Sequence, residues 1–310
     1  MRIIRGVSNL RRDDRNCVVT IGNFDGVHLG HQAILAEVKK ASLRLDCPSL
    51  LICFEPQPKE FFDEYQAPAR LTRFREKVNL LKQCGIDRLL CLKFNEITRG
   101  MKVDEFVSLL ADNLAVKALY VGDDFRFGSD RSGDFSMLQR AGQEFGFQVS
   151  NFYTFTFERE RVSSTRIRAC LETGQFSEAE TMLGHPYSIA GRVAQGRQVG
   201  RTIGVPTANI QLHRYKAPLS GVYAVEIKGL ADHHLGVANV GVRPTIDGET
   251  IKPILEVHIF DFDADIYGQY VEILFRKKLR EEKKYDGIEA LKQAINKDIN
   301  EARQFFLLDA

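Results

Sequence analysis

A chain of 310 residues, 44% of them hydrophobic, is long enough to bury two cores of ordinary domain size, so we expect a two-domain globular protein. The formal net charge is only +2 and the charged residues of both signs are interspersed, which argues against nucleic acid as a partner. No apolar run approaches the length of a membrane span and the first residues lack the apolar core of a signal peptide, so we expect no membrane partner and a cytoplasmic location. The six cysteines fall mostly inside apolar runs and lack C-x-x-C spacing, and we interpret them as reduced core thiols.

From residue 16 to about residue 183, short apolar runs alternate with segments of helical period, which predicts βαβ units and a Rossmann-like parallel sheet. The predicted strands are residues 17–21, 49–54, 88–93, 118–121 and 147–152. The predicted helices between them are residues 31–45, 73–84, 103–113 and 135–145. Such sheets bind ligands at the carboxyl ends of their strands, so we expect function in the loops that leave the strands.

A glycine-rich segment follows the first predicted strand and opens the first predicted helix. It reads Gly22-Asn23-Phe24-Asp25-Gly26-Val27-His28-Leu29-Gly30-His31. Amides at a helix N-terminus bind anions, and glycines let a phosphate approach the backbone. His28 and His31 are three residues apart, so both rings lie on one side of the first turn and can donate to a polyphosphate. An ordinary turn with two incidental surface histidines is the alternative. The predicted phosphate-binding residues beside the histidines are Gly22, Phe24, Asp25 and Gly30.

Two later segments point to the same end of the sheet. Residues 121–128 leave a predicted strand and crowd acidic, basic and aromatic groups together, so we interpret Asp124 and Phe125 as ligand-facing rather than as parts of a solvated turn. Residues 161–168 are typical of a capped helix start flanked by guanidinium groups. They are either a plain N-cap with exposed arginines or a set of hydroxyls, amides and arginines that holds a triphosphate. That predicted set is Arg161, Ser164, Thr165 and Arg168.

The second half of the chain has a different hydrophobic pattern. After a short helical stretch at 176–183, period-two segments separated by glycine and proline predict a small antiparallel barrel, closed by an amphipathic helix at about 287–305. The predicted strands of the barrel are residues 187–193, 222–227, 235–240, 254–260 and 271–275. We place the boundary near Gly184, which gives domains 1–184 and 185–310.

A second glycine-rich loop opens the C-terminal domain. Its glycines and its arginine predict a phosphate-binding loop, although their spacing matches neither the Walker motif nor the Rossmann motif. The predicted phosphate-binding residues are Gly196, Gly200, Arg201 and Gly204. Thr207 and Asn209 follow in an extended segment, two residues apart and therefore on one side, and their oxygens are hard donors suited to Mg²⁺. The alternative is a hairpin with a polar edge. Glu256 lies farther on in an otherwise apolar strand, where its bare pattern favours a solvent-side residue.

The N-terminal motifs together resemble the nucleotidyltransferase domain of bacterial bifunctional FAD synthetases. The matching motifs are G-x-F-D-G-x-H-x-G-H, V-G-x-D-F-x-F-G, S-S-T-x-I-R and F-x-P-x-P, the last at Phe54, Pro56 and Pro58. The resemblance implies that this domain joins FMN to the AMP part of ATP and releases pyrophosphate with the help of Mg²⁺. It implies that the two histidines, Ser164, Thr165 and Arg168 bind ATP, that Asp124 helps to hold the nucleotide or the flavin, and that the F-x-P-x-P residues and Phe125 contact the flavin.

The C-terminal motifs resemble, in order, the riboflavin kinase domain of the same enzymes. They are Gly221-Val222-Tyr223-Ala224, the segment from Asn239 through Arg243 to Thr245, the strand of Glu256, and Asp265-Ile266-Tyr267-Gly268. The resemblance implies that Glu256 is the general base, that Thr207 and Asn209 bind the Mg²⁺-nucleotide, and that Asn239 and Arg243 contact the flavin. Two residues depart from the family pattern: Gln195 stands where His is common, and Val205 where Phe is common.

The sequence therefore predicts an ATP- and Mg²⁺-dependent enzyme that converts riboflavin to FMN and FMN to FAD. We expect small-molecule substrates and a monomer or weak homo-oligomer. Two alternatives remain at this stage: a nucleotidyltransferase that acts on a pantetheine or cytidylyl-type acceptor, and a flavin-binding sensor or carrier without turnover.

Overall fold

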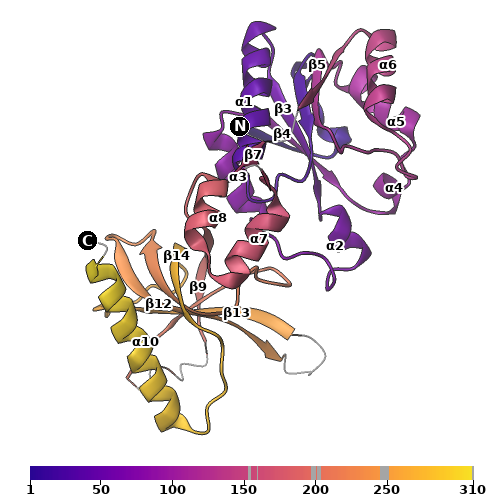
Figure 1. The fold of residues 1–310 in the computed structure, drawn as a ribbon. Helices are drawn as coiled ribbons and strands as arrows, with labels where there is room; N and C mark the ends of the chain where they lie inside the picture. The colour runs from indigo at the N-terminus through magenta and orange to yellow at the C-terminus, as the bar shows by residue number, and fades with distance from the viewer. Residues whose placement is uncertain (153–154, 159, 197–199, 201–203, 245–250, 309–310) are drawn as a thin grey trace. The chain divides into compact units, whose positions relative to one another are not determined.

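A computed structural model describes the chain except residues 153–154, 159, 197–199, 201–203, 245–250 and 309–310 (Figure 1). The described residues form two compact units. The first, which we call the nucleotide unit, comprises Met1–Ala67 and Phe74–Ser163, and the second, the barrel unit, comprises Pro68–Arg73 and Ser164–Ala310.

The nucleotide unit is built on a six-stranded sheet in which every pairing is parallel. In spatial order the strands are β1 (Arg2–Arg5), β4 (Arg88–Lys93), β3 (Ser49–Glu55), β2 (Val18–Ile21), β5 (Ala118–Gly122) and β6 (Gln148–Phe152). The five predicted strands are confirmed. The edge strand β1 was not predicted, because it has only two apolar residues between two arginines.

Helices cover both faces of this sheet. Helices α1 (Leu29–Arg44) and α3 (Phe74–Gln83) pack on one face, through a core that includes Leu35, Leu51 and Leu81. Helix α5 (Val103–Ser108), the π-helical turn Leu109–Asn113 and α6 (Phe135–Phe145) pack on the other. The shorter elements are η1 (Val7–Asn9), η2 (Arg12–Asp14), α2 (Pro58–Phe62), α4 (Glu96–Arg99), β7 (Thr156–Phe157) and β8 (Glu160–Arg161).

The strand order places a switch point between β2 and β5. From β2 the chain moves to β3 on one side, whereas β5, the other neighbour of β2, is reached only later in the sequence. The loops that leave β2 and β5 therefore diverge, and they open the crevice in which such sheets bind ligands. The predicted loops at 22–31 and 121–128 leave these two strands.

The barrel unit is a closed six-stranded barrel, and all of its pairings are antiparallel. Around the barrel the strands are β10 (Ala208–Ile210), β13 (Ile251–Ile259), β12 (His234–Pro244), β11 (Gly221–Lys228), β14 (Tyr270–Arg280) and β9 (Ser188–Ala194). Helix α10 (Ile288–Leu308) packs along the outside, over a core that contains Val222, Val237 and Ala302 (Figure 1). The predicted barrel and closing helix are confirmed, while the three-residue strand β10 was missed.

Two helices that precede the predicted boundary belong to the barrel unit. They are α7 (Ser164–Thr173) and α8 (Phe176–Leu183). The ring of Phe176 lies 5.7 Å from that of Tyr223 on β11, which fixes α8 to the barrel. The segment Pro68–Arg73 joins the same unit, because the Arg73 guanidinium donates to the carbonyl oxygens of Gln211 and Leu212 at 3.1 and 3.2 Å. None of the helices formed by the described residues combines the length and apolar character that a bilayer crossing needs.

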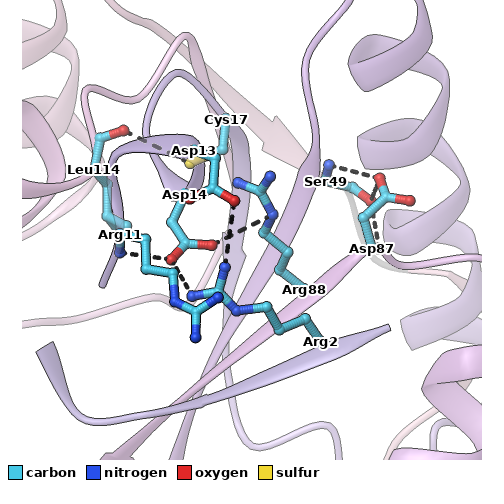
Figure 2. Close-up of polar contacts among 9 residues, drawn as sticks. All are labelled: Arg2, Arg11, Asp13, Asp14, Cys17, Ser49, Asp87, Arg88 and Leu114. Carbon is cyan, nitrogen blue, oxygen red and sulfur yellow. Dashed lines mark hydrogen bonds and ion pairs between the residues drawn. The ribbon is translucent and has the colours of Figure 1, made fainter. Parts of the chain in front are cut away.

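A buried carboxylate ties together strand starts at the amino edge of the parallel sheet (Figure 2). Asp14 has no exposed surface, and its Oδ2 accepts from the Arg2 guanidinium at 2.6 Å and from the Arg11 amide at 2.8 Å. The Nε of Arg88 lies 3.5 Å from its other oxygen. Arg2 begins β1 and Arg88 begins β4, so this carboxylate holds two neighbouring strands in place on the edge opposite the predicted loops at 22–31 and 121–128.

Removing this charge is expected to destabilise the nucleotide unit. We expect the substitution Asp14→Asn to lower the free energy of unfolding by about 3 kcal/mol, because it leaves two largely buried guanidinium groups without their carboxylate. Asp13 is the matched control: it is 69% exposed and lies 3.6 Å from Arg2, so Asp13→Asn should cost less than about 1 kcal/mol. Urea titration of both variants measures the difference, and equal midpoints would contradict the structural role of Asp14.

Candidate functional site

The two predicted histidines meet at the start of α1. His28 is the N-cap residue of this helix, and its Nδ1 accepts from the backbone N–H of His31 at 3.4 Å. The rings of His28 and His31 stack with centroids 3.6 Å apart and an interplanar angle of 18°. The Phe24 ring lies against His31, and the two ring centroids are 4.8 Å apart. Because Nδ1 of His28 is an acceptor, the neutral ring carries its proton on Nε2.

The loop that presents these histidines has an unusual backbone. Phe24, Gly26 and Val27 all have positive φ, at 47°, 81° and 41°. Only glycine adopts such values without strain, and valine least readily. The strain is offset by packing, because the side chains of Phe24 and Val27 are buried in the core beneath α1. Position 30 has little room for a side chain, because a Cβ there would stand only 3.3 Å from the His28 ring.

Burial keeps His31 neutral. Desolvation lowers its pKa well below 6.5, and the neighbouring charges of His28, Lys77 and Arg161 lower it further. Its Nδ1 is buried and has no hydrogen-bond partner among the described residues. Asp25 is also buried, three residues before the N-cap. A neutral imidazole and the amide groups of the first turn of α1 thus lie together where an anion would be stabilised.

The loop that leaves β5 contributes two carboxylates, Asp123 and Asp124, that pair with Arg161. The Arg161 guanidinium donates to Asp124 Oδ2 at 3.1 Å and lies 3.9 Å from Asp123 Oδ1. Both members of the hydrogen-bonded pair are exposed. Since Arg161 also acts electrostatically on His31, the predicted residues Asp124 and Arg161 belong with the histidines in one cluster of the nucleotide unit. Gly22, Phe24, Asp25 and Gly30 lie in the same loop as the histidines.

Of the residues predicted to contact a flavin, Phe54 and Phe125 lie in two aromatic clusters of the nucleotide unit. Phe54 is the last residue but one of β3, its ring is nearly at right angles to that of Phe94, 5.7 Å away, and Phe61 packs on Phe94 as well. Pro56 follows a cis peptide bond, and Pro58 is the first residue of α2. Phe125 stacks on Phe127 at 5.9 Å in the second cluster. Phe61 and Phe94 were not singled out from the sequence, because isolated phenylalanines resemble ordinary core residues.

Three predicted nucleotide-binding residues lie in the barrel unit as the structure divides the chain. Ser164 is the first residue of α7, Thr165 is exposed beside it, and Arg168 follows one turn later. The Nε of Arg168 donates to the carbonyl oxygen of Ala69 at 2.5 Å. That contact fixes the segment Pro68–Arg73 to α7.

In the barrel, strand register brings three predicted kinase residues into one row. Asn209 of β10 and Asn239 of β12 are both paired with Glu256 of β13. Directly opposed residues of antiparallel strands share a face, so the three side chains lie on one side of the sheet. Neighbouring positions such as Leu255 and Val257 are buried in the interior, which places the polar row on the outer face. The bare sequence pattern also put Glu256 on the solvent side, and that position is compatible with a role in chemistry.

Two glycines of the predicted phosphate-binding loop approach other residues closely. A Cβ on Gly196 would overlap the side-chain amide of Asn209, and one on Gly200 would overlap the carbonyl oxygen of Val205. The Val205 amide donates to the Gly200 carbonyl at 2.8 Å, and Gly204 has a φ of 81°. Arg201 lies outside the described residues. Of Arg243, only the backbone, within β12, is described.

A cavity of about 360 Å³ opens beside Thr207. Apolar walls come from the strands, and two carboxylates, an aromatic ring and a phenol come from the loop after β13. The lining residues are Val193, Pro206, Thr207, Ala208, Val257, Ile259, Phe262, Asp263, Ala264, Asp265, Ile266 and Tyr267. His258 of β13 bonds through Nδ1 to the Pro206 carbonyl at 2.9 Å and so holds the segment before Thr207 in place.

The described residues contain no group of three His, Cys, Asp or Glu side chains that could hold a metal ion. The Thr207 hydroxyl and the Asn209 amide oxygen are hard donors, and they fit a Mg²⁺ that also takes oxygens from a nucleotide.

Comparisons with known proteins agree with the family resemblance predicted for each half of the chain. A family model described as FAD synthetase matches residues 10–166, and one described as riboflavin kinase matches residues 183–306. A relative from Escherichia coli strain K12, named bifunctional riboflavin kinase/FMN adenylyltransferase, is 47% identical over 99% of this chain and 98% of its own length. A relative of the same name from Pseudomonas fluorescens is 49% identical over 98% of this chain and 97% of its own length.

A solved structure shares the fold along the whole chain. It is described as a macrolide-efflux protein from Streptococcus pneumoniae, is 30% identical, and has a TM-score of 0.80 over 96% of this chain and 97% of that one. Its name differs from those of the curated relatives, whereas both family models and the relatives agree with one another. The two models match in order along one chain, and the relatives that carry both names are nearly the same length, so the protein belongs to the bifunctional riboflavin kinase/FMN adenylyltransferase family.

Proposed function

We propose that residues 185–310 phosphorylate riboflavin to FMN with ATP, and that residues 1–184 transfer the AMP group of a second ATP to FMN to make FAD. The observation that carries this proposal is that each half of the chain gathers the polar residues its reaction needs: the stacked histidines at the switch point, and the Asn209–Glu256–Asn239 row on the barrel. Membership of the family favours a flavin over a pantetheine or cytidylyl-type acceptor. The presence of Glu256, Thr207 and the histidines argues against a carrier without turnover.

In the adenylyl transfer, a phosphate oxygen of FMN attacks the α-phosphorus of ATP. A new P–O bond joins the two phosphates, the bond between the α-phosphorus and its bridging oxygen breaks, and pyrophosphate leaves. His28 and His31 donate hydrogen bonds to the phosphate oxygens as charge builds on them, and the amides of the first turn of α1 add to this stabilisation. Gly22 and Gly30 belong to the phosphate-binding loop, and their lack of a Cβ makes room for the rings of Phe24 and His28.

The other predicted residues position the substrates of this reaction. Arg161, Ser164, Thr165 and Arg168 bind the nucleotide. Asp124 bonds to Arg161 and helps to hold the nucleotide or the flavin, and Phe24 and Asp25 belong to the phosphate-binding loop. Phe54, Pro56, Pro58 and Phe125 contact the flavin. The support for these roles is their match to the family motifs together with the contacts described above.

In the kinase reaction, the Glu256 carboxylate takes the proton of the ribityl 5′-hydroxyl. The hydroxyl oxygen then attacks the γ-phosphorus of ATP, and ADP leaves. Thr207 and Asn209 would hold Mg²⁺, which would neutralise charge on the nucleotide phosphates. Gly196, Gly200, Arg201 and Gly204 bind the phosphates, while Asn239 and Arg243 contact the flavin. The cavity beside Thr207 takes part of the nucleotide.

The setting that we propose for these reactions is simple. The substrates are small molecules, the protein works in the cytoplasm as a monomer or weak homo-oligomer, and it needs neither nucleic acid nor a membrane. The mild net charge and the absence of a membrane-crossing helix among the described residues are compatible with this setting.

Replacing both histidines should disable FAD formation alone. We expect the double substitution His28→Ala and His31→Ala to lower the rate of FAD formation from supplied FMN by about 10²- to 10³-fold, as loss of such donors usually does. Riboflavin phosphorylation by the same protein should stay within about twofold, which controls for folding. If FAD formation stays within about tenfold of the wild type, the assignment of the histidines is wrong.

Replacing Glu256 should have the opposite effect. Glu256→Gln keeps the shape of the side chain and removes the base, so we expect riboflavin phosphorylation to fall by at least about 10²-fold while FAD formation from supplied FMN is unchanged. The assay follows the two products separately by chromatography. Parallel loss of both activities in a folded protein would contradict the assignment of two separate sites.

The neutral His31 also predicts how stability depends on pH. In the unfolded chain this histidine takes up a proton as the pH falls through 6.5, whereas in the folded chain burial, His28, Lys77 and Arg161 hold its pKa well below that value. The unfolded state therefore binds more protons below pH 6.5, and the stabilising contribution of neutral His31, complete above that pH, is lost as the pH falls.

Thermal unfolding between about pH 7.5 and about pH 5 tests this dependence. His31→Asn should reduce the acid-induced fall in melting temperature relative to the wild type. The control is His213→Asn, because His213 is exposed and asparagine tolerates its φ of 44°. A His31→Asn variant as acid-sensitive as the wild type would contradict the assigned neutral state.

A further inference from the structure

A lysine occupies a core position in helix α3. The inward-facing residues of this helix are Phe74, Lys77, Val78 and Leu81, with the spacing of an apolar stripe. The side chain of Lys77 has no exposed surface. An apolar residue at this position would stabilise the helix against the sheet, whereas an ammonium there loses its hydration.

The Lys77 ammonium has no hydrogen-bond partner among the described residues. The buried carboxylate Asp14, in contrast, is bonded to Arg2 and lies beside Arg88. A buried charge without a partner costs several kcal/mol of stability, so in proteins such charges are normally paired. Lys77 is therefore equipped to bind an anion.

The surroundings of Lys77 place its charge close to the predicted phosphate site. Val78 and Leu81, on the same face of α3, belong to one core cluster with Cys53 and Cys91. The charge of Lys77 also acts on these two thiols and on the ring of His31. Cys53 and Cys91 are paired on neighbouring strands, two residues before the carboxyl ends of β3 and β4. Two strand residues span about 7 Å, so the core in which Lys77 is buried lies just below the edge of the sheet that carries the predicted loops at 22–31 and 121–128.

A second buried polar atom without a partner in the described residues lies on the same side of the sheet. It is Nδ1 of His31, in the first turn of α1. The Lys77 ammonium, Nδ1 of His31 and the N-terminus of the sixteen-residue helix α1 thus lie on the same side of the sheet in the nucleotide unit. A phosphate group is the ligand chemistry that satisfies all three, because it offers several acceptor oxygens and negative charge.

We propose that the Lys77 ammonium binds a phosphate oxygen of a substrate during adenylyl transfer. This inference rests on the proposed function and adds to it a catalytic residue outside the family motifs named above. Lysine binds phosphate as a compact point charge, so the contact needs no fixed fork geometry. Because Lys77 is fully covered, neighbouring side chains must move when the substrate binds, as side chains at binding sites commonly do. The phosphate belongs either to ATP or to FMN.

The test compares Lys77→Met with Lys82→Met in the full-length protein. Methionine keeps the length of the side chain and removes the charge, and Lys82 is an exposed lysine on the same helix. We expect Lys77→Met to lower kcat/KM for FAD formation from FMN by about 10²-fold or more, because it removes a charged contact to the reacting phosphates. Lys82→Met should leave that rate within about twofold, and both variants should phosphorylate riboflavin like the wild type.

Two further measurements separate this role from a structural one. The melting temperature of Lys77→Met should equal or exceed that of the wild type, since an unpaired buried charge does not stabilise the fold. Lys77→Arg, which keeps the charge, should restore part of the lost rate. Calorimetric titration of Lys77→Met with ATP alone and with FMN alone then identifies the source of the phosphate, because only the ligand that contacts the lysine should bind more weakly.

The outcomes are decisive. FAD formation by Lys77→Met within about threefold of the wild type would overturn the inference, and so would a Lys77→Met protein that no longer folds, because Lys77 would then be a structural residue. The proposed function fails in a different way: wild-type protein would form no FAD from FMN and ATP, whatever stands at position 77.

Discussion

The divergence of the chain at strands β2 and β5 is the constraint on which the nucleotide unit depends. All six strands run parallel, so their carboxyl ends meet at one edge, and only between β2 and β5 do the following segments leave in opposite directions. The loop after β2 keeps a strained backbone because Phe24 and Val27 are anchored in the core. That strained loop brings His28 to the N-cap of α1 and stacks His31 against it. The Asp14 cluster lies at the other edge, where it can stabilise the sheet without entering the site.

The barrel unit reaches a comparable arrangement by a different route. Antiparallel register places Asn209, Glu256 and Asn239 directly across from one another, so three short polar side chains from distant parts of the chain form one row. Gly196 approaches the side chain of Asn209 so closely that no larger residue would fit there. In both units the site residues are held by regular elements on at least one side, which suits chemistry that depends on positioning and charge rather than on a covalent intermediate.

The sequence predicted most of this structure because its signals are local. Alternating apolar runs located five of the six parallel strands, and the spacing of His28 and His31 predicted their proximity. Strand β1 was missed because it has only two apolar residues between two arginines, and β10 because three residues are too few to show a pattern. The grouping of α7 and α8 with the barrel was also invisible, since it depends on contacts such as that of Phe176 with Tyr223. Lys77 left one faint signal, a lysine in an apolar stripe, and only its burial shows that the position is unusual.

The central claim is that one chain performs two consecutive reactions on a flavin. The most direct measurement is a time course in which the purified protein is given riboflavin, ATP and Mg²⁺, and the flavins are separated by chromatography. The account predicts that FMN appears first and that FAD follows as FMN is consumed, with ADP and pyrophosphate as the other products. Riboflavin that remains unchanged, or FMN that accumulates without any FAD even when FMN itself is supplied, would contradict it.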